Sequence, residues 1–174
     1  MKYSKNPLTN KEYKIPQSLD DSRNIKAFLD QHEGKKVVVV QGLGFVGAVM
    51  SLVCANAIAE EYAVIGVDVP SENSYWKIKS INEGVFPIVA EDPLIEDFYK
   101  KSLEKKNFYA TFDPCSYKYA DVIIIDINLD VQKKSAADFS LENFDVDMSN
   151  FRNAIKSVGD NCKKDALILV ETTV

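Results

Sequence analysis

The feature that most constrains the fold is a run of four valines, Val37–Val40, that leads through one polar residue into a glycine-rich turn. A continuous run of β-branched residues is typical of a strand buried on both faces, as in a parallel sheet covered by helices. The turn has the pattern Gly-x-Gly-x-x-Gly over residues 42–47, and an Ala-, Val- and Leu-rich stretch follows it. The sequence therefore predicts a buried strand, a tight turn and a helix, in that order.

Similar apolar runs recur along the chain and alternate with segments whose apolar residues have helical spacing. We expect five strands, at residues 36–41, 62–69, 108–112, 121–128 and 165–173. The acidic stretch 138–147 is interpreted as a solvated loop. Strands that alternate with helices predict an α/β fold of the Rossmann type, a doubly wound and mostly parallel sheet with helices on both faces.

The beginning of the chain differs in character from the rest. Residues 1–17 are polar and contain two prolines, so we expect an arm that lies over the surface of the protein or of a partner. A capping-box pattern at Ser18–Asp21 predicts a helix that begins there and continues to Gly34. We therefore divide the chain into an N-terminal arm and helix, residues 1–34, and a Rossmann domain, residues 35–174.

Composition argues against several classes of function. The 174 residues are enough for one domain with a sizeable core. A net charge of −5 without a long basic run argues against binding to nucleic acid or to an anionic membrane. No apolar stretch approaches the roughly 20 residues that span a bilayer. Three separated cysteines, Cys54, Cys115 and Cys162, are interpreted as reduced core thiols of a cytoplasmic protein, and no metal site is expected.

Each glycine of the turn has a physical role if the turn binds a dinucleotide. Gly42 permits the tight turn, Gly44 lets the backbone approach a pyrophosphate, and Gly47 lets the helix pack closely against the strand. Asp68, about 20 residues further on at the end of the next strand, would accept hydrogen bonds from an adenosine ribose and favour NAD over NADP. The alternative is a tight turn in some other doubly wound protein, with Asp68 capping a strand end.

Five segments of the chain occur together in the order known from one family. They are GLGFVGAVMS, VIGVDV, KIKSINEGVFPIVAEDPL, YADVIIIDIN and LVETTV. Together they resemble the N-terminal NAD-binding domain of the UDP-glucose/GDP-mannose dehydrogenase family, over roughly residues 35–174. Members of this family oxidise the C6 alcohol of a nucleotide sugar to a carboxylate in two NAD-dependent steps, through a cysteine-bound thiohemiacetal and thioester. The resemblance implies an NAD-dependent dehydrogenase of polysaccharide biosynthesis that acts on a UDP- or GDP-sugar.

The resemblance also implies a set of cofactor-binding residues at the strand ends, namely Gly42, Gly44, Phe45, Val46, Gly47, Asp68, Lys77, Ile127 and Thr172. The turn would hold the pyrophosphate and Asp68 the ribose, while Lys77 stands near the adenosine, where the family often has an arginine. Thr173 is the expected catalytic residue, because its family counterpart lies near the nicotinamide and helps to position the reacting water. The alternatives are a solvated helix charge for Lys77 and an ordinary strand residue for Thr173.

Two departures from the family pattern affect the expected chemistry. The family reads Val-Pro-Thr-Pro or similar after its fourth strand, whereas residues 127–130 read Ile-Asn-Leu-Asp and lack that threonine at the cofactor's edge. The family's catalytic cysteine, lysine and carboxylates lie further along the chain than Val174. We therefore expect residues 1–174 to be a truncated piece that is inactive alone. The sole histidine, His32, is expected to be a solvated residue near a helix end rather than a base.

Two other functions stay open. One is a free-standing regulatory module that binds NAD or another nucleotide, which the altered residues 127–130 and the N-terminal extension favour. The other is the cofactor domain of a different NAD-dependent dehydrogenase, of the 3-hydroxyacyl-CoA or 6-phosphogluconate type. If the chain is part of a full-length nucleotide-sugar dehydrogenase, we expect that enzyme to be a homodimer. Its small-molecule partner would be the nucleotide-sugar substrate.

Overall fold

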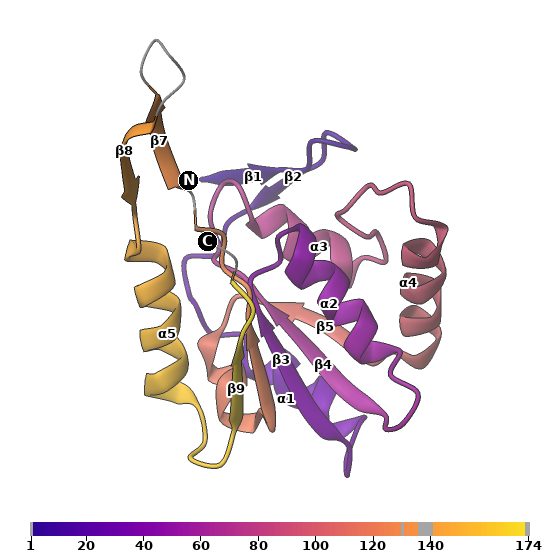
Figure 1. The fold of residues 1–174 in the computed structure, drawn as a ribbon. Helices are drawn as coiled ribbons and strands as arrows, with labels where there is room; N and C mark the ends of the chain where they lie inside the picture. Colours follow the sequence, from indigo (N-terminus) through magenta and orange to yellow (C-terminus); the bar gives the residue numbers. More distant parts are fainter. Residues whose placement is uncertain (1, 130, 136–140, 173–174) are drawn as a thin grey trace.

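A five-stranded parallel sheet forms the centre of the computed structural model, which describes residues 2–129, 131–135 and 141–172 (Figure 1). The strands of this sheet are β3 (Lys36–Gln41), β4 (Tyr62–Val67), β5 (Phe108–Thr111), β6 (Val122–Ile125) and β9 (Leu167–Val170). They are arranged in the order β5-β4-β3-β6-β9, and every neighbouring pair is parallel. The chain therefore reverses its direction of winding between β3 and β6, where open α/β sheets bind their ligands.

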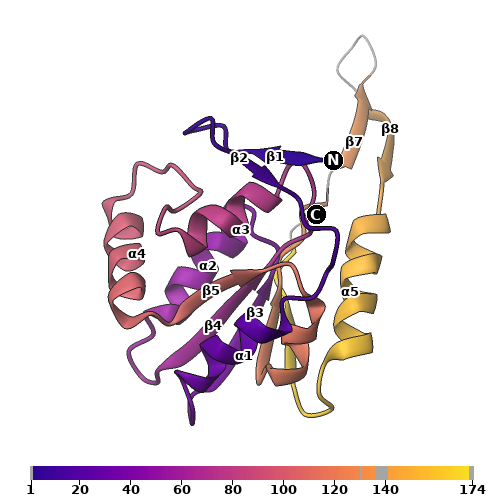
Figure 2. The same cartoon turned by 180° about the vertical axis from the view of Figure 1, so that it is seen from behind.

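Helices cover both faces of this sheet (Figures 1 and 2). One face carries α2 (Phe45–Ala55), α3 (Tyr75–Asn82) and α4 (Pro93–Lys105), and the other carries α1 (Ser22–Asp30), the 3-10 helix η1 (Pro114–Tyr119) and α5 (Ser149–Asn161). Successive valines of β3 alternate between the two layers. Val37 and Val39 pack with α1, η1 and α5, whereas Val38 and Val40 pack with α2. The predicted doubly wound Rossmann-type fold is confirmed.

Helix α1 covers a part of the sheet that the crossover from β5 to β6 covers only thinly. That crossover contains only the six-residue η1. Helix α1, near the N-terminus, contributes Ile25 and Phe28 to the hydrophobic cluster that includes Val39 and Ile123 of the sheet. Ile25 is fully buried. The N-terminal helix is therefore part of the core beneath the sheet.

Polar contacts fix the start of α1 against β5. The carboxylate of Asp21 accepts hydrogen bonds from the Tyr109 hydroxyl at 2.8 Å and from the Thr111 hydroxyl at 2.6 Å. Because this carboxylate faces β5, it does not cap the helix, and the predicted capping box is wrong. The helix runs from Ser22 to Asp30 and so ends earlier than the sequence predicted.

The N-terminal arm forms a β-hairpin on α3. Its strands β1 (Tyr3–Lys5) and β2 (Glu12–Lys14) pair antiparallel. The buried Ser4 hydroxyl accepts a hydrogen bond from the backbone N–H of Trp76 at 3.0 Å, and the Asn6 amide donates to the Ser80 hydroxyl at 3.0 Å. The expected arm over the surface is therefore present, and its polar side chains attach it to a helix of the same chain.

A second hairpin precedes α5. Strands β7 (Val131–Ser135) and β8 (Leu141–Val146) pair antiparallel and project away from the central sheet (Figure 1). The sequence predicted a solvated loop over 138–147, so the part of that prediction that falls on β8 is wrong. Apolar and polar residues alternate only weakly in this stretch, and it contains many carboxylates. Its sequence therefore does not have the pattern of a typical strand.

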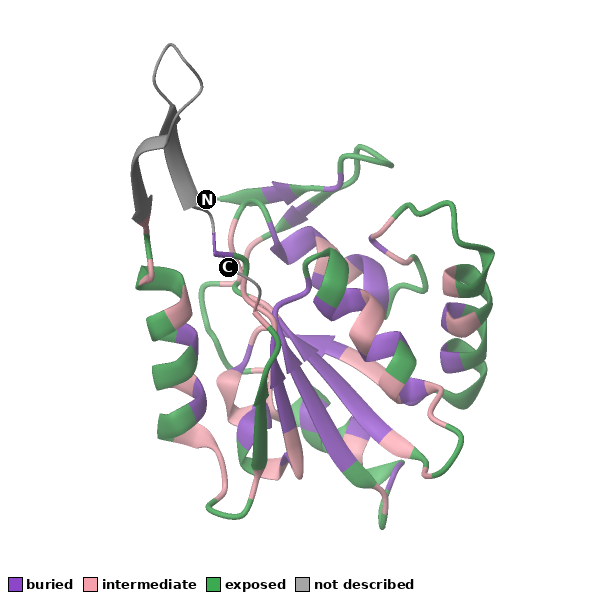
Figure 3. Ribbon diagram, in the orientation of Figure 1, coloured by how far each residue is buried: buried purple, intermediate pink, exposed green. Residues whose placement is uncertain are grey.

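Burial is uneven across the sheet, as Figure 3 shows. The residues of β3 and β4 are almost all buried, whereas all four residues of the edge strand β9 are exposed, with Leu167 at 55% and Val170 at 52%. The most buried part of the sheet therefore lies at β3, β4 and β6. The glycine turn follows the end of β3, and Asp68 and Asp126 follow β4 and β6.

Substitution of Ile25 tests whether α1 belongs to the core. We expect Ile25→Ala to lower the free energy of unfolding by about 2–5 kcal/mol, because it removes a fully buried side chain and leaves a cavity. Lys26→Ala, on the exposed side of the same helix, is the matched control and should change stability by less than about 0.5 kcal/mol. Urea unfolding measures both values, and equal small effects would contradict the account of α1.

Candidate functional site

The glycine turn between β3 and α2 is packed against the backbone at the end of β6. Gly42 has φ +101°, and a side-chain Cβ there would lie 2.0 Å from the carbonyl oxygen of Asp126. A Cβ at Gly47 would lie 2.0 Å from the carbonyl oxygen of Gly42. Since neither backbone oxygen can move far, these two positions accept only glycine, and the turn is as tight as the sequence predicted.

Gly44 differs from the other two glycines of the turn. It has ordinary extended geometry, and a Cβ built there has no atom within 4 Å. Gly44 is also the N-cap residue of α2, and no side chain caps the helix. The first backbone N–H groups of a helix lack partners within the helix and carry a partial positive charge. The space over Gly44 can therefore admit an anion such as a pyrophosphate.

Phe45 and Val46, the first residues of α2, leave their side chains 58% and 50% exposed. Large apolar side chains are exposed here because the start of the helix lies at the open edge of the sheet rather than in the core. Both residues thus stand where the cofactor site was predicted.

Asp68 follows β4 and lies beside the glycine turn. Its carboxylate accepts a hydrogen bond from the Leu43 N–H at 3.2 Å and another from the Val69 N–H at 2.8 Å. Burial raises the pKa of Asp68, and the charge of Lys77 lowers it by a smaller amount. The structure therefore brings Asp68, Lys77 and the turn together, as a ribose-binding carboxylate would require.

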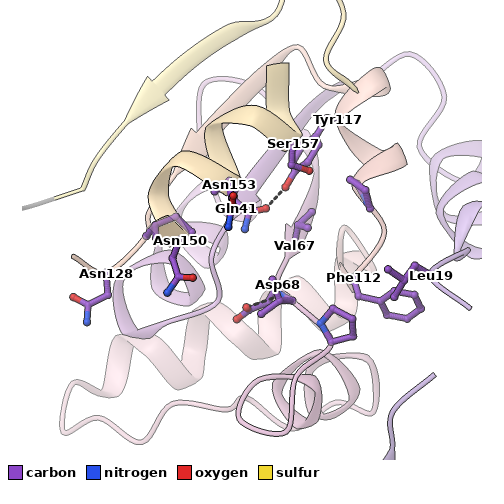
Figure 4. A pocket seen from close by; sticks show the side chains of 15 residues that line it. Leu19, Gln41, Val67, Asp68, Phe112, Tyr117, Asn128, Asn150, Asn153 and Ser157 are labelled. Carbon is purple, nitrogen blue, oxygen red and sulfur yellow. Dashed lines mark hydrogen bonds between the residues drawn. The ribbon is translucent and has the colours of Figure 1, made fainter. Parts of the chain in front are cut away.

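A pocket of about 510 Å³ opens next to Asp68, between the carboxyl ends of the strands and α5 (Figure 4). Amide side chains line it, with Gln41 at the end of β3 and Asn150 and Asn153 on α5. The buried hydroxyl of Tyr117 donates a hydrogen bond to the Gln41 side chain. Amides and backbone groups around an apolar cleft are suited to the edge of a purine base, so the pocket is large and polar enough for an adenosine.

Leu19 of the N-terminal segment also lines this pocket, opposite α5 (Figure 4). Sequence reasoning missed Leu19, as it missed Gln41, Tyr117 and the two asparagines of α5. A contact between such distant parts of the chain leaves no local signal, because it arises only when α1 and α5 pack on the same face of the sheet.

Ile127 and Thr172 lie after the ends of β6 and β9. The backbone N–H of Ile127 donates to the Thr172 hydroxyl at 3.3 Å, and Ile127 Cδ1 lies 3.5 Å from the Cβ position built at Gly42. Ile127 is therefore adjacent to the turn, and Thr172 is bonded to Ile127. Thr173, the predicted catalytic residue, lies outside the described residues.

Asp126, the first residue after β6, is a further charged group at this edge. Its Oδ2 atom lies 3.1 Å from the Cβ position built at Gly47, close to the start of α2. Sequence reasoning placed Asp126 inside a strand and gave it no role. The signal was an acidic residue directly after a run of isoleucines.

Cys54 and Cys115 do not provide an activated nucleophile. All three cysteines are free thiols. Burial raises the pKa of Cys54, and burial together with Asp113 raises the pKa of Cys115 to about 12. Both side chains are therefore neutral thiols at physiological pH, and a thiolate is the nucleophilic form.

His32 is buried, at 7% exposure, rather than solvated, so that prediction is wrong. It lies beyond the end of α1, with its Nε2 atom 2.8 Å from the Lys106 carbonyl oxygen and its ring centroid 4.8 Å from that of Phe28. It thus links the segment after α1 to the C-terminal end of α4. This position is far from the glycine turn.

Among the residues that the structure describes, no group of three or more His, Cys, Asp or Glu side chains could hold a metal ion. None of the helices described is long and apolar enough to cross a membrane.

Comparison with known protein families gives one match that covers most of the chain. Residues 35–174 match the model of the NAD-binding domain of the UDP-glucose/GDP-mannose dehydrogenase family. Among curated proteins, the UDP-N-acetyl-D-mannosamine dehydrogenase of Pyrococcus horikoshii is 28% identical over 137 residues, which are 79% of this chain and 28% of that protein.

Solved structures show the same similarity. An NDP-N-acetyl-D-galactosaminuronic acid dehydrogenase from Methanosarcina mazei Go1 matches with TM-score 0.66 and 25% identity, over 86% of this chain and 30% of that one. GDP-mannose dehydrogenase from Pseudomonas aeruginosa, solved as a ternary complex, matches with TM-score 0.58 and 26% identity, over 79% of this chain and 28% of that one. The chain thus spans less than a third of the length of these relatives.

Alanine at the three glycines of the turn tests the packing. We expect Gly42→Ala and Gly47→Ala each to lower the free energy of unfolding by about 1–3 kcal/mol or more, since each Cβ meets a backbone oxygen. Gly44→Ala is the control, and its effect should stay within about 1 kcal/mol because the space is open. Thermal and urea unfolding give the values; a Gly44→Ala variant as unstable as the others would contradict the geometry.

Proposed function

Because the chain belongs to the UDP-glucose/GDP-mannose dehydrogenase family, we propose that it is the cofactor-binding part of an enzyme that oxidises the C6 alcohol of a UDP- or GDP-sugar to the uronate. The matched region is the NAD-binding domain of that family, so its cofactor is NAD. We assign residues 35–174 to this domain and residues 1–34 to an N-terminal arm and helix attached to it. The nucleotide-sugar substrate and a homodimer belong to the proposal for the full-length enzyme.

The observation that carries the proposal is the open space over Gly44 beside the uncapped start of α2, with Asp68 at the end of the neighbouring strand. In the proposed complex, the backbone N–H groups of Phe45 and Val46 hold the pyrophosphate. Gly44 is the residue that allows the phosphates to approach, since any side chain there would enter the same space.

The two nucleosides are assigned to opposite sides of the glycine turn. Asp68 accepts hydrogen bonds from the adenosine ribose, and Lys77 lies on the same side. The adenine is assigned to the part of the pocket of about 510 Å³ that Leu19, Asp68 and Pro70 line, and the part lined by Ile127 lies on the nicotinamide side. The nicotinamide is assigned to the ends of β6 and β9, near Ile127 and Thr172, where NAD would accept a hydride from the substrate.

We propose that Thr173 acts near the nicotinamide and helps to position the reacting water. The support for this role is that Thr173 directly follows Thr172 in the sequence. A cytoplasmic location is supported by three free cysteines, because reduced thiols are typical of that compartment.

Cofactor discrimination tests the role of Asp68. We expect the chain to bind NAD much more tightly than NADP, because a 2′-phosphate would meet the Asp68 carboxylate. Asp68→Ala should weaken NAD binding by about tenfold, through loss of charge-assisted hydrogen bonds, and should tighten NADP binding because Lys77 remains to pair with the phosphate. Calorimetry with both nucleotides measures this.

Gly44→Val is the companion variant for the pyrophosphate. It should abolish the binding of both nucleotides while the thermal unfolding midpoint stays close to that of the wild type. Unchanged NAD binding by Gly44→Val would show that the dinucleotide does not approach the turn, and equal wild-type affinities for NAD and NADP would contradict the assignment of Asp68.

Turnover by residues 1–174 tests where the catalytic groups are. We expect this chain to bind NAD and to form no NADH with a panel of UDP- and GDP-sugars, because Cys54 and Cys115 are neutral thiols with raised pKa values. Loss of a nucleophile and its base removes several orders of magnitude in rate. Absorbance at the NADH band measures the reaction, with a full-length product as the positive control. NADH formed by the 174-residue chain would show that its own residues catalyse the oxidation.

A further inference from the structure

Asp126 is held in a fixed position beside the glycine turn. Its backbone N–H donates to the Gln41 carbonyl at 2.9 Å. Its carbonyl oxygen lies only 2.0 Å from the position that a Cβ of Gly42 would take. The main chain at this point can therefore shift little without disturbing β3 and the turn, and the side chain starts from a defined place at the carboxyl edge of the sheet.

The side chain of Asp126 points to the start of α2. Its Oδ2 atom lies 3.1 Å from the Cβ position built at Gly47, and the nearby Gly47 N–H acts to lower the pKa of Asp126. A carboxylate at the first turn of a helix is stabilised by the partial positive charge of the helix dipole. Asp126 thus places, from within the protein, a negative group beside the Gly47 N–H, next to the N–H groups of Phe45 and Val46 that are assigned to the pyrophosphate.

Among the described residues, the charged group that acts on Asp126 is another carboxylate. Burial raises the pKa of Asp126, and Glu171, which follows β9, raises it by a smaller amount. Asp68 is the other carboxylate at this edge, at the end of β4, and the cation that acts on it is Lys77. A pyrophosphate that arrives at α2 therefore meets the negative charge of the Asp126 carboxylate.

We propose that Asp126 determines the affinity of the site for its dinucleotide: in its ionised form it competes with the pyrophosphate for the start of α2, and in its neutral form it permits tight binding. This inference rests on the proposed function, because it takes the ligand to be NAD. Like charges a few ångströms apart near a protein surface repel strongly enough to change an affinity by about tenfold or more.

Neutralising Asp126 is the direct test. We expect Asp126→Asn to tighten NAD binding by about tenfold in calorimetry at neutral or mildly alkaline pH, and to leave the binding of adenosine, which has no phosphate, unchanged. Asp126→Ala should also tighten NAD binding, which separates loss of the charge from any new hydrogen bond by the asparagine amide. Glu104→Gln, on the exposed face near the end of α4, changes the net charge equally at the opposite edge of the sheet and is the control.

The pH dependence gives a second readout. As the pH falls, the wild-type Asp126 becomes protonated, so the difference in NAD affinity between the wild type and Asp126→Asn should shrink. The other carboxylates at this edge of the sheet are present in both proteins, so the comparison between the two isolates the contribution of Asp126.

The possible outcomes separate this inference from the proposed function. NAD affinities of Asp126→Asn and Asp126→Ala no higher than those of the wild type and Glu104→Gln would overturn the inference and leave the NAD site standing. A wild type that binds NAD weakly beside an Asp126→Asn variant that binds it well would support both. Failure of all four proteins to bind NAD would overturn both.

Discussion

The candidate site depends on one backbone contact, between the glycine turn after β3 and the end of β6. Gly42 lies against the Asp126 carbonyl, Gly47 lies against the Gly42 carbonyl, and the Asp126 N–H donates to Gln41. These contacts bring the start of α2 to the point where the strand order reverses. They also leave Gly44 as the one glycine of the turn with open space above it. The tight packing of two glycines thus creates the opening at the third, which a phosphate could occupy.

The same contact explains why Asp126 is so well placed to affect binding. A residue directly after β6 cannot move away from α2, because its own backbone is part of the packing that holds the turn. Its carboxylate is therefore a permanent feature of the site, unlike a charge on a surface loop. The N-terminal segment contributes in a different way, since α1 fills the core below β5 and η1 while Leu19 reaches the neighbouring pocket.

The sequence could predict those parts of the fold that have strong local signals. The valine run of β3, the glycine spacing and Asp68 each require a specific backbone environment, and all three lie where they were expected. The capping box at Ser18 failed because tertiary hydrogen bonds from Tyr109 and Thr111 took the Asp21 carboxylate. Burial of His32 and the lining of the pocket could not be predicted, because both arise from elements far apart in the sequence that meet only in the folded chain.

The central claim is that the pyrophosphate of NAD binds at the start of α2, and amide NMR spectra test it most directly. NAD and adenosine are titrated separately into the labelled chain, and the backbone amide resonances are followed. The account predicts that the amides of Phe45, Val46 and Gly47 shift with NAD and stay unchanged with adenosine, whereas the amide of Val69, beside Asp68, shifts with both. NAD-induced shifts that leave residues 45–47 unaffected would contradict it.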